Sequence, residues 1–196
     1  MTGSIYLETI ETECPVAIDV SFVEKAPPAK LSFEEKKDFW SAKHKAYGYK
    51  ILCAVDRGGR CVFASNLFPG SVHDLEIARD EKTLPSLKKL IELHGGKLLA
   101  DKGFIGLDAS VATVTPTRQN QDEIEGLNLE IASQRVIIEN FFGRMKHLFL
   151  ILDHLYRTPV EYLEQMIIVL IWLTNEHVKI KPLRRHSIEP AISSQE

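Results

Sequence analysis

The clearest hydrophobic pattern near the start of the chain is an apolar, β-branched run from Val16 to Val23, which reads VAIDVSFV. Such a run predicts a buried strand, and it contains a single acid, Asp19. Residues 49–55 (YKILCAV) and 60–68 (RCVFASNLF) are also strand-like. The segment 56–59 between them (DRGG) favours a tight turn, so the two runs are predicted to form a β-hairpin.

The rest of the chain alternates helical patterns with short apolar runs. The order of strand, hairpin, helices, two short strands and two helices predicts a mixed α/β domain over residues 1–182, followed by a polar tail, 183–196. The further predicted elements are a loop with one helical turn over 25–46, a helix from Ser71 or His73 to Asp80, a helix over 84–94, strands over 97–100 and 111–115, and helices over about 128–152 and 159–180.

Composition limits what such a domain can do. A chain of 196 residues that is 44% hydrophobic can bury one sizeable core. The formal charge of −3 provides no overall basic footprint for nucleic acid, so any DNA contact has to be local.

Cysteines and apolar runs bear on the compartment. Cys14, Cys53 and Cys61 do not form a zinc-type pattern and favour free thiols with a structural role, with Cys53 and Cys61 facing each other across the hairpin. The longest apolar run, 166–173, is far shorter than the roughly 20 residues that span a bilayer. The N-terminus lacks the pattern of a secretory signal. We therefore expect an intracellular protein that makes no membrane contact.

Three acids stand beside strong apolar runs on three different predicted elements. Asp19 interrupts the first strand, Asp101 follows the strand KLLA, and Glu139 lies within VIIENFF on a helix. An ionised acid without a partner is costly to bury, so such acids are either paired with Lys or Arg or bind a cation. Mg²⁺ and Mn²⁺ prefer oxygen ligands, and two such ions can stabilise the attacking and leaving oxygens of phosphodiester cleavage.

Four motifs, in this order, make the chain resemble a known family: AIDVSF, YGYKILCAVDRGGRCVFASNLFPGSVHDLEIARD, LLADKGF and RVIIENFFGRMK. They resemble the catalytic domain of PIF/Harbinger-type transposases, which are DDE superfamily endonucleases and include the Harbinger-derived nucleases. The resemblance covers roughly residues 16–154. It implies an α/β, ribonuclease H-like fold with a mixed central sheet flanked by helices.

The resemblance also implies a site and an activity. Asp19, Asp101 and Glu139 would be the catalytic acids and the ligands of two Mg²⁺ or Mn²⁺ ions. The expected activity is metal-dependent cleavage of DNA and strand transfer. Transposases of this kind carry a DNA-binding region ahead of the catalytic domain, whereas 18 residues precede Asp19 here. We therefore expect DNA and a DNA-binding accessory protein as partners. A homo-oligomer is a further alternative. If the source is eukaryotic, we expect the protein in the nucleus.

Five further residues are candidates for accessory roles. Asp74, or Ser71, would cap a helix, or Asp74 would lie near the metal site. Arg135 precedes Glu139 by one helical turn and can neutralise it when metal is absent. Lys102, Arg144 and Lys146 are either solvated charges or phosphate contacts.

Two rival functions remain open from the sequence alone. One is a catalytically inactive or domesticated domain that keeps the fold for DNA or protein interaction. The other is a ribonuclease H-like nuclease that acts on RNA or on hybrids. Metal binding that depends on all three acids would separate the first rival from a nuclease, and substrate competition would separate the second.

Overall fold

The computed structural model describes residues 14–27, 29–116, 122–153, 155–157 and 159–183. At its centre lies β1 (Val16–Glu24), which pairs antiparallel with β3 (Ala46–Asp56) along its whole length. On its other edge β1 pairs in parallel with β6 (Leu98–Leu99), which in turn pairs in parallel with β7 (Thr113–Val114). The strands predicted over 16–23, 97–100 and 111–115 are therefore confirmed as β1, β6 and β7, the last two in shorter form.

The far edge of β3 is covered by three short antiparallel strands, β2 (Trp40–Ser41), β4 (Cys61–Ala64) and β5 (Phe68–Pro69). The predicted hairpin is confirmed, but its second strand is not continuous over 60–68. The interruption lies at Ser65, whose hydroxyl accepts a hydrogen bond from the Leu52 backbone N–H. The Ser65 N–H still donates to the Leu52 carbonyl at 2.9 Å, so the side chain takes the place of one backbone acceptor only. Beyond Ser65 the chain leaves β3 before rejoining it at β5.

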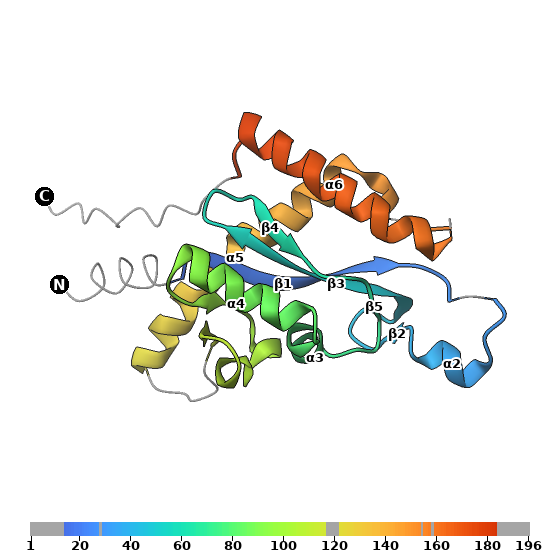
Figure 1. Ribbon diagram of the computed structural model, residues 1–196, viewed down its shortest axis with the longest axis horizontal. Coiled ribbons are helices and arrows are strands. Elements are labelled where there is room, and N and C mark those ends of the chain that lie inside the picture. Colours follow the sequence, from blue (N-terminus) through green and yellow to red (C-terminus); the bar gives the residue numbers. More distant parts are fainter. Residues whose placement is uncertain (1–13, 28, 117–121, 154, 158, 184–196) are drawn as a thin grey trace, which may run out of the picture.

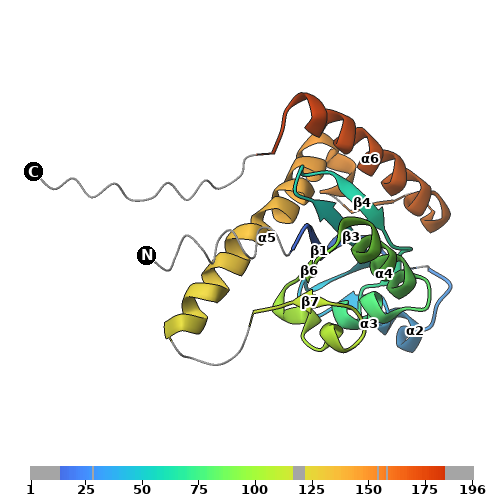
Figure 2. The same ribbon diagram turned by 60° about the vertical axis from the view of Figure 1, so that its left-hand side comes forward.

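Helices cover both faces of this mixed sheet (Figure 1). On one face lie α3 (Asp74–Arg79) and α4 (Thr83–His94), and on the other lie α5 (Asp122–Leu148) and α6 (Val160–Ile180), as the turned view of Figure 2 also shows. All four helices were predicted. The main difference is α5, which begins before residue 128 and ends at Leu148, where the 3₁₀ turn η3 (Leu150–Leu152) takes over.

The two faces of β1 and β3 are both buried, which explains their nearly continuous apolar sequences. Side chains alternate between faces along a strand. Val16, Ile18 and Leu52 therefore join the core beneath α3 and α4, whereas Ala17 and Cys53 join the core beneath α5 and α6. Asp19 follows Ala17 by two residues, so its side chain lies on the same face of the sheet, the face covered by α5 and α6 (the α5 face).

The cysteines behave as the sequence predicted. Cys14, Cys53 and Cys61 are buried free thiols. A hydrogen bond with Cys61 and burial together raise the pKa of the Cys53 thiol well above its ordinary value, so a structural role suits it.

The segments that connect these elements are short. A capping box closes the N-terminus of α2 (Phe33–Lys37), in which Ser32 and Glu35 hydrogen-bond each other's backbone N–H. This helix is the single turn predicted for the loop. The 3₁₀ turns η1 (Lys102–Phe104) and η2 (Leu107–Ala109) connect β6 to β7.

Among the described residues, no helix combines the length and the apolar character that a membrane crossing requires.

Candidate active site

The first two acids lie side by side because of the register of the sheet. Ala17 of β1 pairs in parallel with Leu99 of β6. Two residues further along each strand direction stand Asp19, within β1, and Asp101, just after β6, so the two acids lie at the same level of the sheet. Each carboxylate is oriented by the next backbone N–H, Asp19 by that of Val20 at 2.8 Å and Asp101 by that of Lys102 at 2.7 Å.

The third acid comes from α5, which packs across β1. One stripe of this helix is buried and consists of Ile131, Arg135, Ile138, Phe141, Phe142 and Met145. Their spacing of three and four residues is that of a helix face packed on a core. Glu139 follows Ile138 at the border of this stripe, and its side chain is 55% exposed, so it faces solvent beside the other two acids.

Arg135 joins all three acids. Its Nη2 atom lies 3.3 Å from Oδ2 of Asp19 and 3.5 Å from Oε1 of Glu139, and its Nη1 atom lies 3.4 Å from Oδ1 of Asp101. The predicted contact between Arg135 and Glu139 is confirmed. Contact with the two aspartates was not predicted, because nothing in the helical spacing relates Arg135 to β1 or β6.

Burial changes the electrostatics of Asp19 most. Desolvation raises the pKa of this carboxyl above its ordinary value of 3.8, and the neighbouring Asp101 adds to the rise. The Val20 hydrogen bond and the Arg135 and Lys43 cations act in the opposite direction without cancelling it. A nearby cation therefore favours the ionised form of Asp19.

The donors suit a hard divalent cation in kind, since all three offer carboxylate oxygens. Their present spacing does not suit one. Within the described part of the chain, no three His, Cys, Asp or Glu side chains lie close enough together to hold a metal ion. The cation on which the acids converge here is the Arg135 guanidinium.

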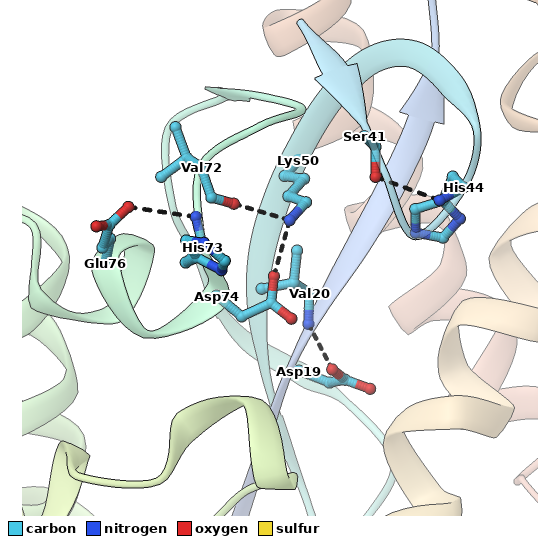
Figure 3. A network of polar contacts seen from close by, with 9 residues as sticks. All are labelled: Asp19, Val20, Ser41, His44, Lys50, Val72, His73, Asp74 and Glu76. Carbon is cyan, nitrogen blue, oxygen red and sulfur yellow. Dashed lines mark hydrogen bonds and ion pairs between the residues drawn. The ribbon is translucent and has the colours of Figure 1, made fainter. Parts of the chain in front are cut away.

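A second charged pair lies on the opposite face of the sheet (Figure 3). Lys50 of β3 donates to the Val72 carbonyl at 2.7 Å and forms an ion pair with Asp74 at 3.1 Å. Asp74 also borders the loop after β6, because a Cβ atom on Gly103 would lie 3.3 Å from its Oδ2 atom. The pair thus ties α3 to β3, next to the loop that carries Asp101.

The predicted capping by Ser71 or Asp74 is wrong. His73 precedes the first turn of α3, and its backbone N–H donates to the carboxylate of Glu76 at 3.3 Å, as Figure 3 shows. Asp74 is instead engaged by Lys50. The importance of Lys50 was missed, although a single lysine inside the apolar run YKILCAV was a visible signal.

The remaining basic candidates differ in their surroundings. Arg144 donates to the Lys181 carbonyl at 2.9 Å and lies 2.9 Å from Nδ1 of His177, so it ties α5 to the end of α6. Lys102 is exposed beside Asp101, and Lys146 is half-buried. A phosphate contact by any of the three stays a prediction.

Comparison with known proteins places the chain in one family. No curated protein and no solved structure gave a significant match to the chain. One family model, described as DDE superfamily endonuclease, matches residues 18–175, which include all three acids, α5 and most of α6. The chain belongs to the DDE superfamily endonucleases.

Proposed function

We propose that this chain is the divalent-metal-dependent DNA endonuclease and strand-transfer domain of a PIF/Harbinger-type transposase, with a ribonuclease H-like fold. The observation that carries the proposal is the convergence of Asp19, Asp101 and Glu139, from two adjacent parallel strands and a packed helix, on a single cation. Membership of the DDE superfamily endonucleases supports it. The order and spacing of the four sequence motifs support the subfamily.

The arrangement of strands supports the ribonuclease H-like part of the proposal. A long central strand has an antiparallel partner on one edge and two short parallel strands on the other, with helices on both faces. This topology places the residues that follow β6 beside the first half of β1. An acid on each strand then lies where a helix on the same face can add the third.

Asp19, Asp101 and Glu139 would hold two Mg²⁺ or Mn²⁺ ions. Once bound, such ions activate the attacking oxygen and stabilise the leaving oxygen of an in-line displacement at a DNA phosphate. The chain's own residues orient the ligands. The Val20 and Lys102 N–H groups hold the two aspartates, and the exposure of Asp101 and Glu139 leaves the site open to a DNA strand.

DNA is the substrate that the endonuclease family implies. Lys102 beside Asp101 and Lys146 on α5 are the proposed phosphate contacts. Because the overall charge is −3, these local cations provide little affinity. We therefore propose a DNA-binding accessory protein, and a homo-oligomer is the further assembly to test.

The proposal is tested by nicking of a supercoiled plasmid with Mn²⁺ and with Mg²⁺. Asp101→Asn and Glu139→Gln remove a ligand charge with little change of shape. Each should reduce nicking by more than about a hundredfold, because even the outer partners of metal ligands cost 10- to 100-fold when lost. Asp108→Asn, an exposed acid in the same loop region, is the matched control and should nick like the wild type.

The alternatives give different results. A folded wild type that neither nicks nor binds Mn²⁺ by calorimetry would overturn the enzyme proposal and favour an interaction domain. Nicking that survives in both variants would overturn the assignment of the acids. Preferential cleavage of RNA or hybrid competitors would move the substrate away from DNA.

A further inference from the structure

Arg135 occupies the point at which the three acids meet. We infer that Arg135 is a resident counter-ion that a divalent metal ion must displace, so that the arginine and the metal compete for the same carboxylates. The inference rests on the proposed function, because it concerns how that metal site is loaded. It goes beyond it by giving a role to a residue that is neither a metal ligand nor a substrate contact.

The position of Arg135 is unusual for a cation. It lies in the buried stripe of α5 between Ile131 and Ile138, and it is 8% exposed. A charged side chain at such a position is stable only when it is paired. The partners that stabilise its buried charge are Asp19, Asp101 and Glu139, which lie on three separate parts of the chain.

The bonds themselves are suited to exchange. Charge-assisted bonds from a guanidinium are about 2.7–2.9 Å long when the geometry is good. The three contacts of Arg135 are all longer, at 3.3–3.5 Å, and none is a bidentate pair. The buried Nε atom has no hydrogen-bond partner among the described residues. Arg135 is thus shared among the acids without an optimal bond to any of them.

The charge balance leaves room for a stronger cation. One guanidinium, with a single positive charge, faces three carboxylates at 3.3–3.5 Å. A divalent ion contributes twice the charge and accepts oxygen ligands from several directions. The flexible stem of Arg135 allows its head group to withdraw toward solvent when the ion binds.

Competition makes two linked predictions. Removing the arginine should strengthen metal binding, because the metal no longer has to displace a bound cation. It should also destabilise the metal-free fold, because three acids then lie together without a counter-ion. A residue that merely positions the ligands would give the opposite sign for metal binding.

The experiment measures Mn²⁺ binding by calorimetry and the thermal midpoint with Mn²⁺ and with EDTA. Arg135→Gln keeps the length and polarity of the stem and removes the charge. We expect its Kd for Mn²⁺ to fall about tenfold and its midpoint in EDTA to drop by about 5 °C, with much of that drop recovered in Mn²⁺. Arg60→Gln removes an arginine from another carboxylate, Asp56, and should leave the Kd unchanged.

A second measurement needs no variant. The side-chain Nε–Hε signal of Arg135 in the wild type should shift as Mg²⁺ is added, because the guanidinium leaves the acids. If Arg135→Gln fails to fold, this titration decides the matter. A signal that stays in place while Mg²⁺ binds would overturn the inference.

The outcomes separate this inference from the proposed function. Equal or weaker Mn²⁺ binding by Arg135→Gln overturns the competition and leaves the nuclease proposal standing. Absence of Mn²⁺ binding in both the wild type and Arg135→Gln overturns both. Tighter binding by Arg135→Gln, together with the shift of the Arg135 signal, supports both.

Discussion

The imidazole of His44 lies flat against the ring of Phe22, with the ring centroids 4.4 Å apart and the planes 4° from parallel. Desolvation lowers the pKa of His44 below its ordinary value of 6.5, and the cations Lys43, Lys146 and Lys50 lower it further, whereas Asp74 opposes them. His44 therefore reports the positive potential next to the candidate site. The neutral imidazole is the form that the fold favours.

This residue provides a pH prediction. Because the pKa is lower in the folded state than in the unfolded state, the stability that His44 contributes is present above pH 6.5 and is lost as the pH falls through the folded-state pKa. NMR titration of the ring protons should give a midpoint below 6.5. Lys146→Gln should raise that midpoint, whereas Lys88→Gln, an exposed lysine on α4, should not. A wild-type midpoint at or above 6.5 would contradict the account.

At the scale of elements, the pairing of β1 with β3 holds in place the strand that carries Asp19. It runs over the full length of β1, from Val16 opposite Asp56 to Glu24 opposite Gly48. Close approach at one end requires a glycine, since a Cβ atom on Gly48 would overlap the Val23 carbonyl oxygen and the Phe22 ring. In contrast, a Cβ atom on Gly143 of α5 would meet nothing within 4 Å.

These two glycines make a matched pair of tests. Gly48→Ala should lower the free energy of unfolding by more than about 2 kcal/mol, because backbone and a packed ring must shift. Gly143→Ala should raise it by about 0.5–1 kcal/mol, because alanine restricts the unfolded chain and favours the helix. Urea unfolding of the three proteins measures both changes. A stable Gly48→Ala protein would show that β1 and β3 can separate without cost.

For the whole molecule, the main constraint is that an acidic chain is proposed to act on an anionic polymer. With a net charge of −3, long-range attraction to DNA is absent, and three acids at the site repel phosphate until they are neutralised. Affinity then depends on a few cations around the site. Their number sets the salt dependence.

The small number of cations around the site predicts the salt dependence of DNA binding. Anisotropy of a labelled duplex in EDTA should give a plot of log K against log salt with a slope between about −2 and −4, since each neutralised phosphate contributes about −0.9. Lys146→Gln should reduce the slope by about 0.9. Lys88→Gln should leave it unchanged. A slope near −8 would reveal a larger basic surface than the proposal contains.

Much of the fold could be predicted because its signals are local. The nearly continuous apolar run Val16–Val23 and the helical periods of α4 and α6 reflect which side chains face a core, and a sequence shows that directly. The three acids were also visible, since each interrupts or borders an apolar run. What the local pattern could not show was the break at Ser65, because it depends on a hydrogen bond from the Leu52 N–H of the facing strand to the Ser65 hydroxyl.

The sequence by itself determined the elements, their order and the candidate acids, because these depend on neighbours along the chain. Tertiary structure decided which atoms meet. The parallel register of β1 and β6 places Asp19 beside Asp101, and the packing of α5 brings Arg135 to both. Contacts between residues more than a hundred positions apart, such as Asp19 and Arg135, depend on strand register and helix packing, and no spacing along the chain encodes them.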